Sequence, residues 1–173
     1  MTSKDVLYSK GQNDECLTPK YAIEPLLKYI PICWRIWCPF DKENSNFVQV
    51  FKKHGYNVVA SHIDDGQDFY TYTPKQHFDC IISNGPFTNK KLIFKRALEL
   101  GKPFLLLSPC TWFNDSALSS LFGDGKEMQV LFFNKRVKFE NNGIIQNKIT
   151  FASCFIGKGI LPRQIVFEKI NID

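Results

Sequence analysis

The chain has 173 residues, of which 44% are hydrophobic and 23% charged, a composition typical of one globular domain with its own core. The net charge of +5 comes from 22 basic and 17 acidic residues, an excess that permits nucleic-acid binding but does not require it. No apolar run approaches the ~20 residues of a membrane helix, and the polar start lacks a signal-peptide core, so we expect an intracellular, cytoplasmic protein.

Cysteine and histidine spacing gives no indication of a metal site. The six cysteines include no Cys-x-x-Cys pair, and the three histidines are scattered without ligand spacing. Structural zinc sites need such paired ligands. We therefore expect no metal, and we interpret the cysteines inside apolar runs as buried free thiols.

The first half of the chain predicts helices that alternate with strands. Residues 1–13 resemble a flexible arm, after which Thr18 can cap a helix that has Pro19 at its first position. Apolar spacing then predicts a helix to residue 30, a strand over 32–40, a helix over 45–53, a strand over 56–63, a short strand over 68–70 and a strand over 78–83.

The second half begins in the same way and ends in strands. The pattern predicts a helix over 88–100, a strand over 103–108, a short helix over 115–122, a strand over 128–133, and two antiparallel strands over 149–156 and 164–170. This order predicts an α/β fold with three layers, whose mainly parallel sheet has an antiparallel C-terminal edge. With no linker or repeat, residues 14–173 form a single predicted domain.

The segment with the most chemical information is Asn84-Gly85-Pro86-Phe87, which directly follows the apolar strand over 78–83. Ligands of open α/β sheets bind at this carboxyl edge. The Asn84 amide oxygen and the Gly85 carbonyl can each accept one N–H of an amine, which directs its lone pair at a methyl donor and stabilises developing positive charge. Pro86 stiffens the turn, and Phe87 can stack on a planar substrate. The alternative is a Gly-Pro turn in which Asn84 only caps the following helix.

This motif resembles the Asn-Pro-Pro-Phe/Tyr motif of amino methyltransferases. Over residues 14–170 the chain is similar to class I methyltransferases that use S-adenosylmethionine, and most like the small adenine-N6 DNA methyltransferases of phages and mobile elements. The resemblance implies a Rossmann-like methyltransferase fold and places a set of residues at the cofactor: Thr18 and Pro19; Pro39, Phe40 and Asp41 in the first-strand loop; Asp64 or Asp65 after the second strand; and Asp68 with Phe69 at the cofactor's adenine.

Two features depart from the family pattern. The first-strand loop usually contains glycines that let the backbone approach the cofactor, but residues 38–46 contain none. Gly85 stands where the family has proline. It either loosens a working turn or has moved to a positive φ that proline cannot adopt.

The resemblance implies methyl transfer to the N6 amine of adenine in DNA, with the target base flipped out of the helix. Phe87 and Trp112 are the predicted walls of the base pocket, and Lys90 and Lys91 are predicted to contact DNA. For Trp112 the alternative is a core tryptophan at the end of a strand. RNA adenine, cytosine N4 or a protein glutamine amide would suit the same motif. A catalytically silent methyltransferase-like protein that binds nucleic acid or a host protein is the alternative from another class.

Specificity is a separate expectation. Nearly all residues after Phe87 are needed to complete the sheet, so little remains to recognise a DNA sequence. Either specificity is low, or an oligomer or a partner subunit supplies it, as in a restriction-modification system.

Overall fold

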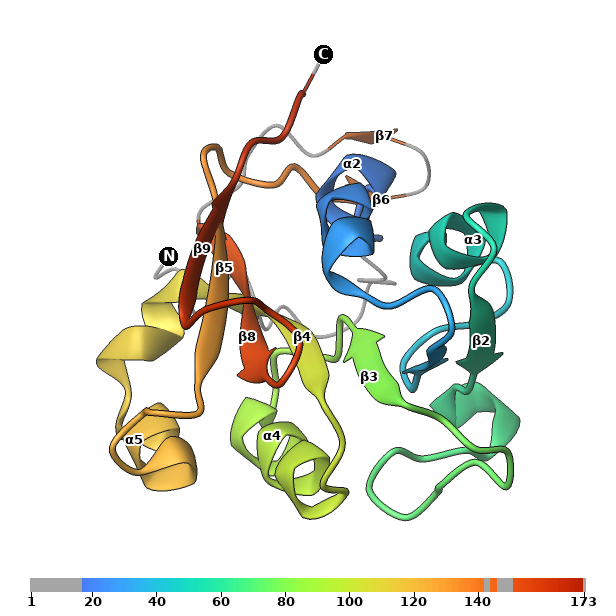
Figure 1. The fold of residues 1–173 in the computed structure, drawn as a ribbon, viewed down its shortest axis with the longest axis horizontal. Helices are drawn as coiled ribbons and strands as arrows, with labels where there is room; N and C mark the ends of the chain where they lie inside the picture. The colour runs from blue at the N-terminus through green and yellow to red at the C-terminus, as the bar shows by residue number, and fades with distance from the viewer. Residues whose placement is uncertain (1–16, 142–143, 146–150, 173) are drawn as a thin grey trace.

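The computed structural model describes residues 17–141, 144–145 and 151–172 (Figure 1). The predicted N-terminal arm, residues 1–13, lies outside this part of the chain. A seven-stranded sheet in the order β2-β1-β3-β4-β8-β5-β9 dominates the fold. Its strands are β1 Arg35–Cys38, β2 Asn57–Ala60, β3 Cys80–Ser83, β4 Phe104–Pro109, β5 Gln129–Phe133, β8 Ser153–Lys158 and β9 Ile165–Glu168; a separate pair consists of β6 Glu140–Asn141 and β7 Ile144–Ile145.

The direction of the strands confirms the predicted fold class. All neighbours in the large sheet are parallel except β8, which is antiparallel to both β4 and β5. The two C-terminal strands run in opposite directions, as predicted. They do not form a hairpin, because β9 pairs with the far side of β5 and residues 159–164 cross over that strand.

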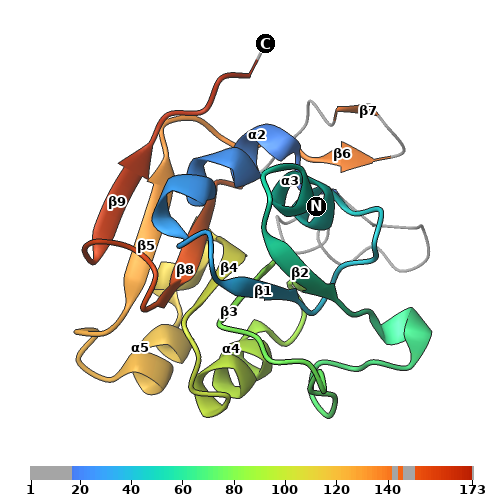
Figure 2. The same cartoon turned by 45° about the vertical axis from the view of Figure 1, so that its right-hand side comes forward.

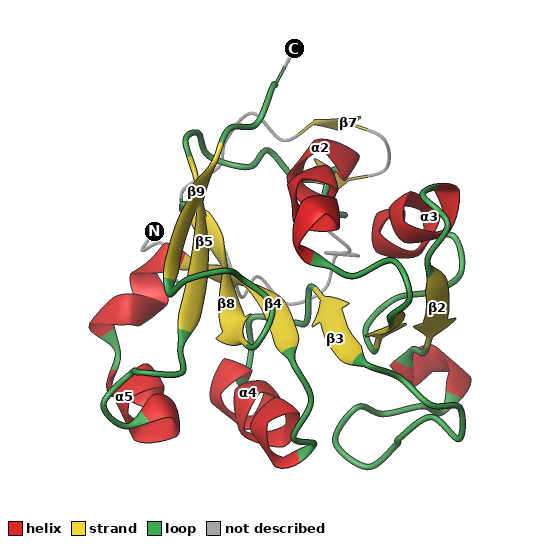
Figure 3. Cartoon of the chain, viewed as in Figure 1, coloured by secondary structure: helices red, strands yellow, loops and turns green. Residues whose placement is uncertain are grey.

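Helices cover both faces of the sheet, which gives the three layers (Figures 1 and 2). On one face lie α2 and α3, and on the other lie α4 and α5 (Figure 3). The helices are α2 Lys20–Ile23, α3 Asn46–Lys53, α4 Lys90–Glu99 and α5 Ser116–Phe122, with 3₁₀ turns η1 Glu24–Tyr29, η2 Ile63–Asp65 and η3 Cys110–Asn114.

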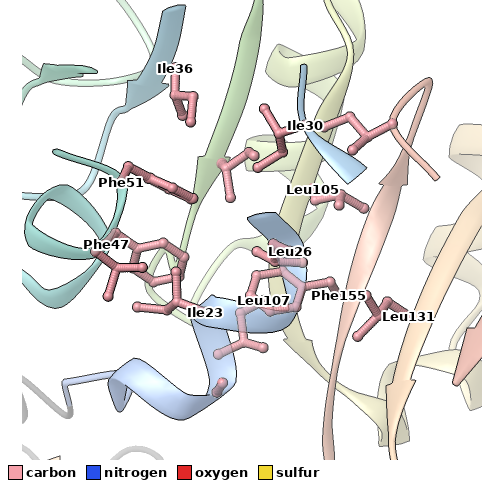
Figure 4. Close-up of a cluster of buried hydrophobic side chains, with 14 of the residues drawn as sticks. Ile23, Leu26, Ile30, Ile36, Phe47, Phe51, Leu105, Leu107, Leu131 and Phe155 are labelled. Atoms are coloured by element: carbon pink, nitrogen blue, oxygen red, sulfur yellow. The ribbon is translucent and has the colours of Figure 1, made fainter. Parts of the chain in front are cut away.

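The apolar strands bury side chains on both faces, so two core clusters form. Under α2 and α3 the first cluster includes Ile23, Leu26, Phe47, Phe51, Leu105, Leu107 and Phe155 (Figure 4). The second, on the side of α4, includes Trp37, Phe69, Ile93, Phe94, Phe104 and Leu106. Alternate residues of β4 thus enter opposite clusters, which explains why its sequence is continuously apolar.

Several element boundaries differ from the prediction. The first helix changes to 3₁₀ geometry at Glu24, because Pro25 lacks an N–H and its ring crowds the preceding turn. Thr18 does not cap this helix; Pro19 is the N-cap and no side chain caps it. The first strand begins only at Arg35, the second ends at Ala60, and residues 68–70 form no strand.

Candidate active site

Asn84 directly follows β3 at the carboxyl edge of the sheet. Its Nδ2 donates to Thr18 Oγ1 at 3.2 Å, while its Oδ1 is buried without a hydrogen-bond partner. The alternative reading of Asn84 as a helix cap is wrong, because the N-cap of α4 is Asn89. A buried acceptor without a donor costs free energy, so an added N–H donor at this oxygen would be favourable.

Asp41 joins the ends of β1, β2 and β3. Its N–H donates to the Ser61 carbonyl at 3.1 Å, and its carboxylate accepts from Ser83 Oγ. Burial raises the pKa of Asp41 to about 6, although hydrogen bonds from Ser83 and Ser45 oppose that shift. The site therefore contains a carboxyl group whose ionised form is destabilised by burial and whose protonation state changes near neutral pH.

Phe40 and Gly85 are packed against each other. Gly85 is not among the glycines with positive φ, so the suggestion that it had moved to such a conformation is wrong. A Cβ at Gly85 would lie 2.8 Å from Phe40 Cε2 and 3.1 Å from Ile93 Cδ1. The Phe40 ring also lies 5.0 Å from that of Phe69. A large side chain in the glycine-free loop thus occupies the space that a side chain at position 85 would need.

Lys90 does not contact DNA as predicted, because it is only 5% exposed. Its Nζ donates to the Gly85 carbonyl at 3.0 Å and to the Leu107 carbonyl at 2.7 Å. It also lies 5.0 Å from the Phe87 ring centroid. Burial lowers the pKa of Lys90 to about 7. Lys91, in contrast, is exposed.

The structure does not bring the two predicted base-stacking residues together. Phe87 packs against the first core cluster and meets Phe151 edge-on, at 5.4 Å and 90°. Trp112 packs against the second cluster, with its ring 4.8 Å from that of Phe94. Since η3 directs Trp112 toward α4, the prediction of a shared pocket wall is wrong. Pro86, directly before Phe87, is exposed.

The remaining predicted cofactor residues differ in how far they are buried. Pro19 and Pro39 are buried: Pro19 follows Thr18, which bonds to Asn84, and Pro39 lies two residues before Asp41. Asp64, in contrast, is 56% exposed and pairs with Lys42 at 2.6 Å. Asp64 lies in η2, after the end of β2, and its role at the cofactor stays a prediction. Asp65 lies in the same turn and is exposed.

Asp68 and Phe69 form a turn beside the second core cluster. Asp68 Oδ1 accepts from the Tyr70 N–H at 3.0 Å. Phe69 is 2% exposed, and its ring lies 5.4 Å from Trp37. Phe69 therefore already packs against two aromatic rings of the chain, those of Trp37 and Phe40.

Three serine and asparagine residues of the site were not predicted from sequence. Ser83 and Ser61 bond to Asp41, and Asn46 Nδ2 donates to the Thr18 carbonyl at 2.9 Å. Ser83 ends an apolar strand directly before Asn84, which was the available signal. Nothing local marks Ser61 or Asn46, because their partners are distant in sequence.

No family model and no curated protein matches the chain. Solved structures similar to it include a protein provisionally assigned as a modification subunit of a type I restriction enzyme from Vibrio vulnificus YJ016, at 11% identity and a TM-score of 0.49, covering 98% of this chain and 49% of that one. The chain therefore spans about half the length of that subunit.

Two others are provisionally assigned methyltransferases. One, from Thermoplasma acidophilum, has 16% identity and a TM-score of 0.34, with 79% of this chain and 60% of that chain covered. The other is a domain of a precorrin-6Y C5,15-methyltransferase from Corynebacterium diphtheriae, with 16% identity, a TM-score of 0.38 and coverage of 81% and 82%. All three TM-scores are too low to carry a functional inference.

In the part of the chain that the structure describes, no group of three or more His, Cys, Asp or Glu side chains could hold a metal ion. None of the helices there has the length and apolar character to cross a membrane.

Proposed function

We propose that the chain is an S-adenosylmethionine-dependent methyltransferase that acts on the exocyclic N6 amine of adenine in DNA. The observation that carries this proposal is the buried, unpartnered amide oxygen of Asn84 at the carboxyl edge of the sheet. An acceptor in that position suits a substrate that donates an N–H.

The chain's own groups would act on the amine as follows. Asn84 Oδ1 accepts one N–H, and Thr18 holds the amide in the required orientation. The Gly85 carbonyl accepts the second N–H, because a carbonyl has two lone pairs and Lys90 uses one of them. These two acceptors stabilise the positive charge that develops on the nitrogen. The extra proton then leaves to solvent.

S-adenosylmethionine, when bound, supplies an electrophilic methyl group. The residues present fit it in one clear respect, since the unpartnered Asn84 oxygen and the buried Asp41 carboxyl converge at one sheet edge. Thr18, Pro39, Asp41 and Asp68 would hold the cofactor, with Phe40 as the aromatic wall in place of a glycine loop.

The substrate proposal rests on charge and on accessibility. The net charge of +5 and the exposed Lys91 suit a polyanion. A paired adenine hides its amine, so the base must leave the helix before Phe87 can stack on it. A partner subunit or a second copy would supply sequence specificity, as in restriction-modification, in a host cytoplasm.

The experiment combines calorimetric titration of S-adenosylmethionine with methyl incorporation into an adenine-containing and an adenine-free DNA oligonucleotide. We expect wild type to bind cofactor and to label only the first. Asn84→Ala should lose ~10²–10³ in rate with unchanged cofactor affinity. It should also be as stable as wild type or more so, because it removes an unpartnered buried acceptor.

Asn89→Gly is the matched control, because Asn89 is an exposed residue of the same loop whose φ of 59° glycine adopts readily. It should retain activity. Wild-type turnover in Asn84→Ala would remove Asn84 from the mechanism, and wild type without cofactor binding would reject the enzyme proposal.

A silent methyltransferase-like protein that binds nucleic acid or a host protein is the second candidate. Two contacts favour it: the Phe40 ring packs between Gly85 and Phe69, and Lys90 already bonds to the Gly85 carbonyl. That candidate predicts DNA or protein binding without cofactor binding, which the same titration distinguishes.

A further inference from the structure

Lys90 lies at a junction between the motif and the core. It is the first residue of α4, yet its side chain turns inward and is only 5% exposed. Its Nζ reaches the carbonyl of Gly85, after β3, and that of Leu107, in β4, at 3.0 and 2.7 Å. The same nitrogen lies 5.0 Å from the centre of the Phe87 ring.

A lysine in this position is costly, since burial of an amine that carries charge requires desolvation. An apolar side chain of equal length would fill the same volume without that cost. What an apolar side chain lacks is the ability to hold two carbonyls and a ring face together. The three donors of an ammonium match these three acceptors.

We propose that Lys90 is a positioning residue for methyl transfer: it holds the Gly85 carbonyl and the Phe87 ring in the arrangement that receives the amine and its base. This inference rests on the function proposed above. It assigns to Lys90, which lies outside the four-residue motif, the role of orienting Gly85 and Phe87 within that motif. Lys90 itself does not touch the reacting atoms.

The charge of Lys90 should also influence the reaction. The substrate nitrogen becomes positive as the methyl group arrives, so an ammonium directly behind the Gly85 carbonyl opposes the transition state, and a neutral amine does not. The pKa of about 7 places this change within the working range, so the rate should rise as pH increases through about 7.

Few other titratable groups face this amine. The segment from Asn84 to Asn89 and strand β4 contain none in their sequences. From β8, Cys154 faces Lys90, and burial with a hydrogen bond to Cys110 raises the pKa of Cys154, which therefore remains a neutral thiol. The same bond lowers the pKa of Cys110, so Cys110 needs its own control.

The test measures kcat, KM for S-adenosylmethionine and the pH profile of wild type, Lys90→Met and Lys90→Gln. We expect Lys90→Met to lower kcat ~10–100-fold, the scale for loss of positioning, with KM for the cofactor unchanged. The rise of rate through about pH 7 should disappear in both variants. Lys90→Gln should retain more kcat than Lys90→Met, because its amide still donates to a carbonyl.

Lys95→Met is the matched control, because Lys95 is an exposed lysine of the same helix. Cys110→Ser controls for the thiol, and both variants should keep the pH profile. Melting temperatures verify folding, and Lys90→Gln keeps the test valid where Lys90→Met is unfolded. Active variants at position 90 with wild-type kcat and pH profile would overturn the role of Lys90 alone. Wild type that transfers no methyl group would overturn the proposed function, and this role with it.

Discussion

Asp41→Asn should stabilise the protein, and the effect should depend on pH. The pKa of Asp41 is raised from 3.8 to about 6, and at ~1.4 kcal/mol for each pKa unit the difference is worth ~3 kcal/mol. Because the folded state binds the proton more tightly, stability is greatest below about pH 4 and decreases as pH rises through about 6. Asparagine carries no charge at any pH and avoids this penalty.

At pH 7.5 we therefore expect Asp41→Asn to stabilise the fold by ~2–3 kcal/mol, because its amide oxygen can still accept from Ser83. For a chain of this length that corresponds to ~4–12 °C in melting temperature. At pH 4 the variant and wild type should melt at nearly the same temperature. Asp65→Asn, at an exposed position, is the control and should change neither value.

Thermal unfolding followed by circular dichroism at both pH values measures this. Equal shifts at pH 4 and 7.5, or a destabilised variant at pH 7.5, would refute the reasoning that burial of the Asp41 charge is costly. The retention of such a residue is expected where function needs it. Cofactor affinity of the same variant should accordingly fall.

The remaining predictions concern contacts with clear geometry. Gly157→Ala should destabilise the sheet by more than ~3 kcal/mol in urea unfolding, because its Cβ would lie 1.7 Å from the Phe104 carbonyl oxygen. Gly66→Ala should destabilise the fold by only ~1 kcal/mol, because its Cβ would meet nothing within 4 Å and only its φ of 73° is unfavourable. Thr18→Val should lower methyl transfer ~10-fold with little change in melting temperature, since it removes only the anchor of the Asn84 amide.

Local patterns in the sequence predicted the fold well. The strand predicted over 78–83 and the helices predicted over 45–53 and 115–122 all exist, because apolar spacing acts within a few residues. Ser45 and Asp115 prove to be the N-caps of the two helices. The crossing of residues 159–164 over β5 was not predictable, since strand pairing depends on contacts distant in sequence.

The candidate site was predicted less completely, for a related reason. Asn84 lies at the strand end as predicted, whereas its hydrogen bond to Thr18 was not predicted. Lys90, however, belongs to a pair of basic residues, which favours an exposed helix face, whereas the structure buries its side chain at the start of α4. Side-chain direction of this kind follows from backbone geometry that the residue types do not specify.

The last prediction concerns the replacement of Gly85 by proline. Position 85 does not have a positive φ, so proline is not excluded by the left-handed region, and it would restrict the unfolded chain by ~0.4–1 kcal/mol. Its Cβ would nevertheless meet Phe40 Cε2 at 2.8 Å, and overpacking of this kind costs ~1–3 kcal/mol.

Gly85→Pro alone should therefore destabilise the protein by ~1 kcal/mol, whereas in a Phe40→Leu background it should be neutral or stabilising. Urea unfolding of the two single variants and the double variant gives the coupling energy, which should favour the double variant by at least ~0.5 kcal/mol. Additive effects would show that Phe40 and Gly85 do not share space in solution. A favourable coupling would mean that the two departures from the family pattern are linked. Phe40, in the glycine-free loop, then fills the space that a proline side chain at position 85 would occupy.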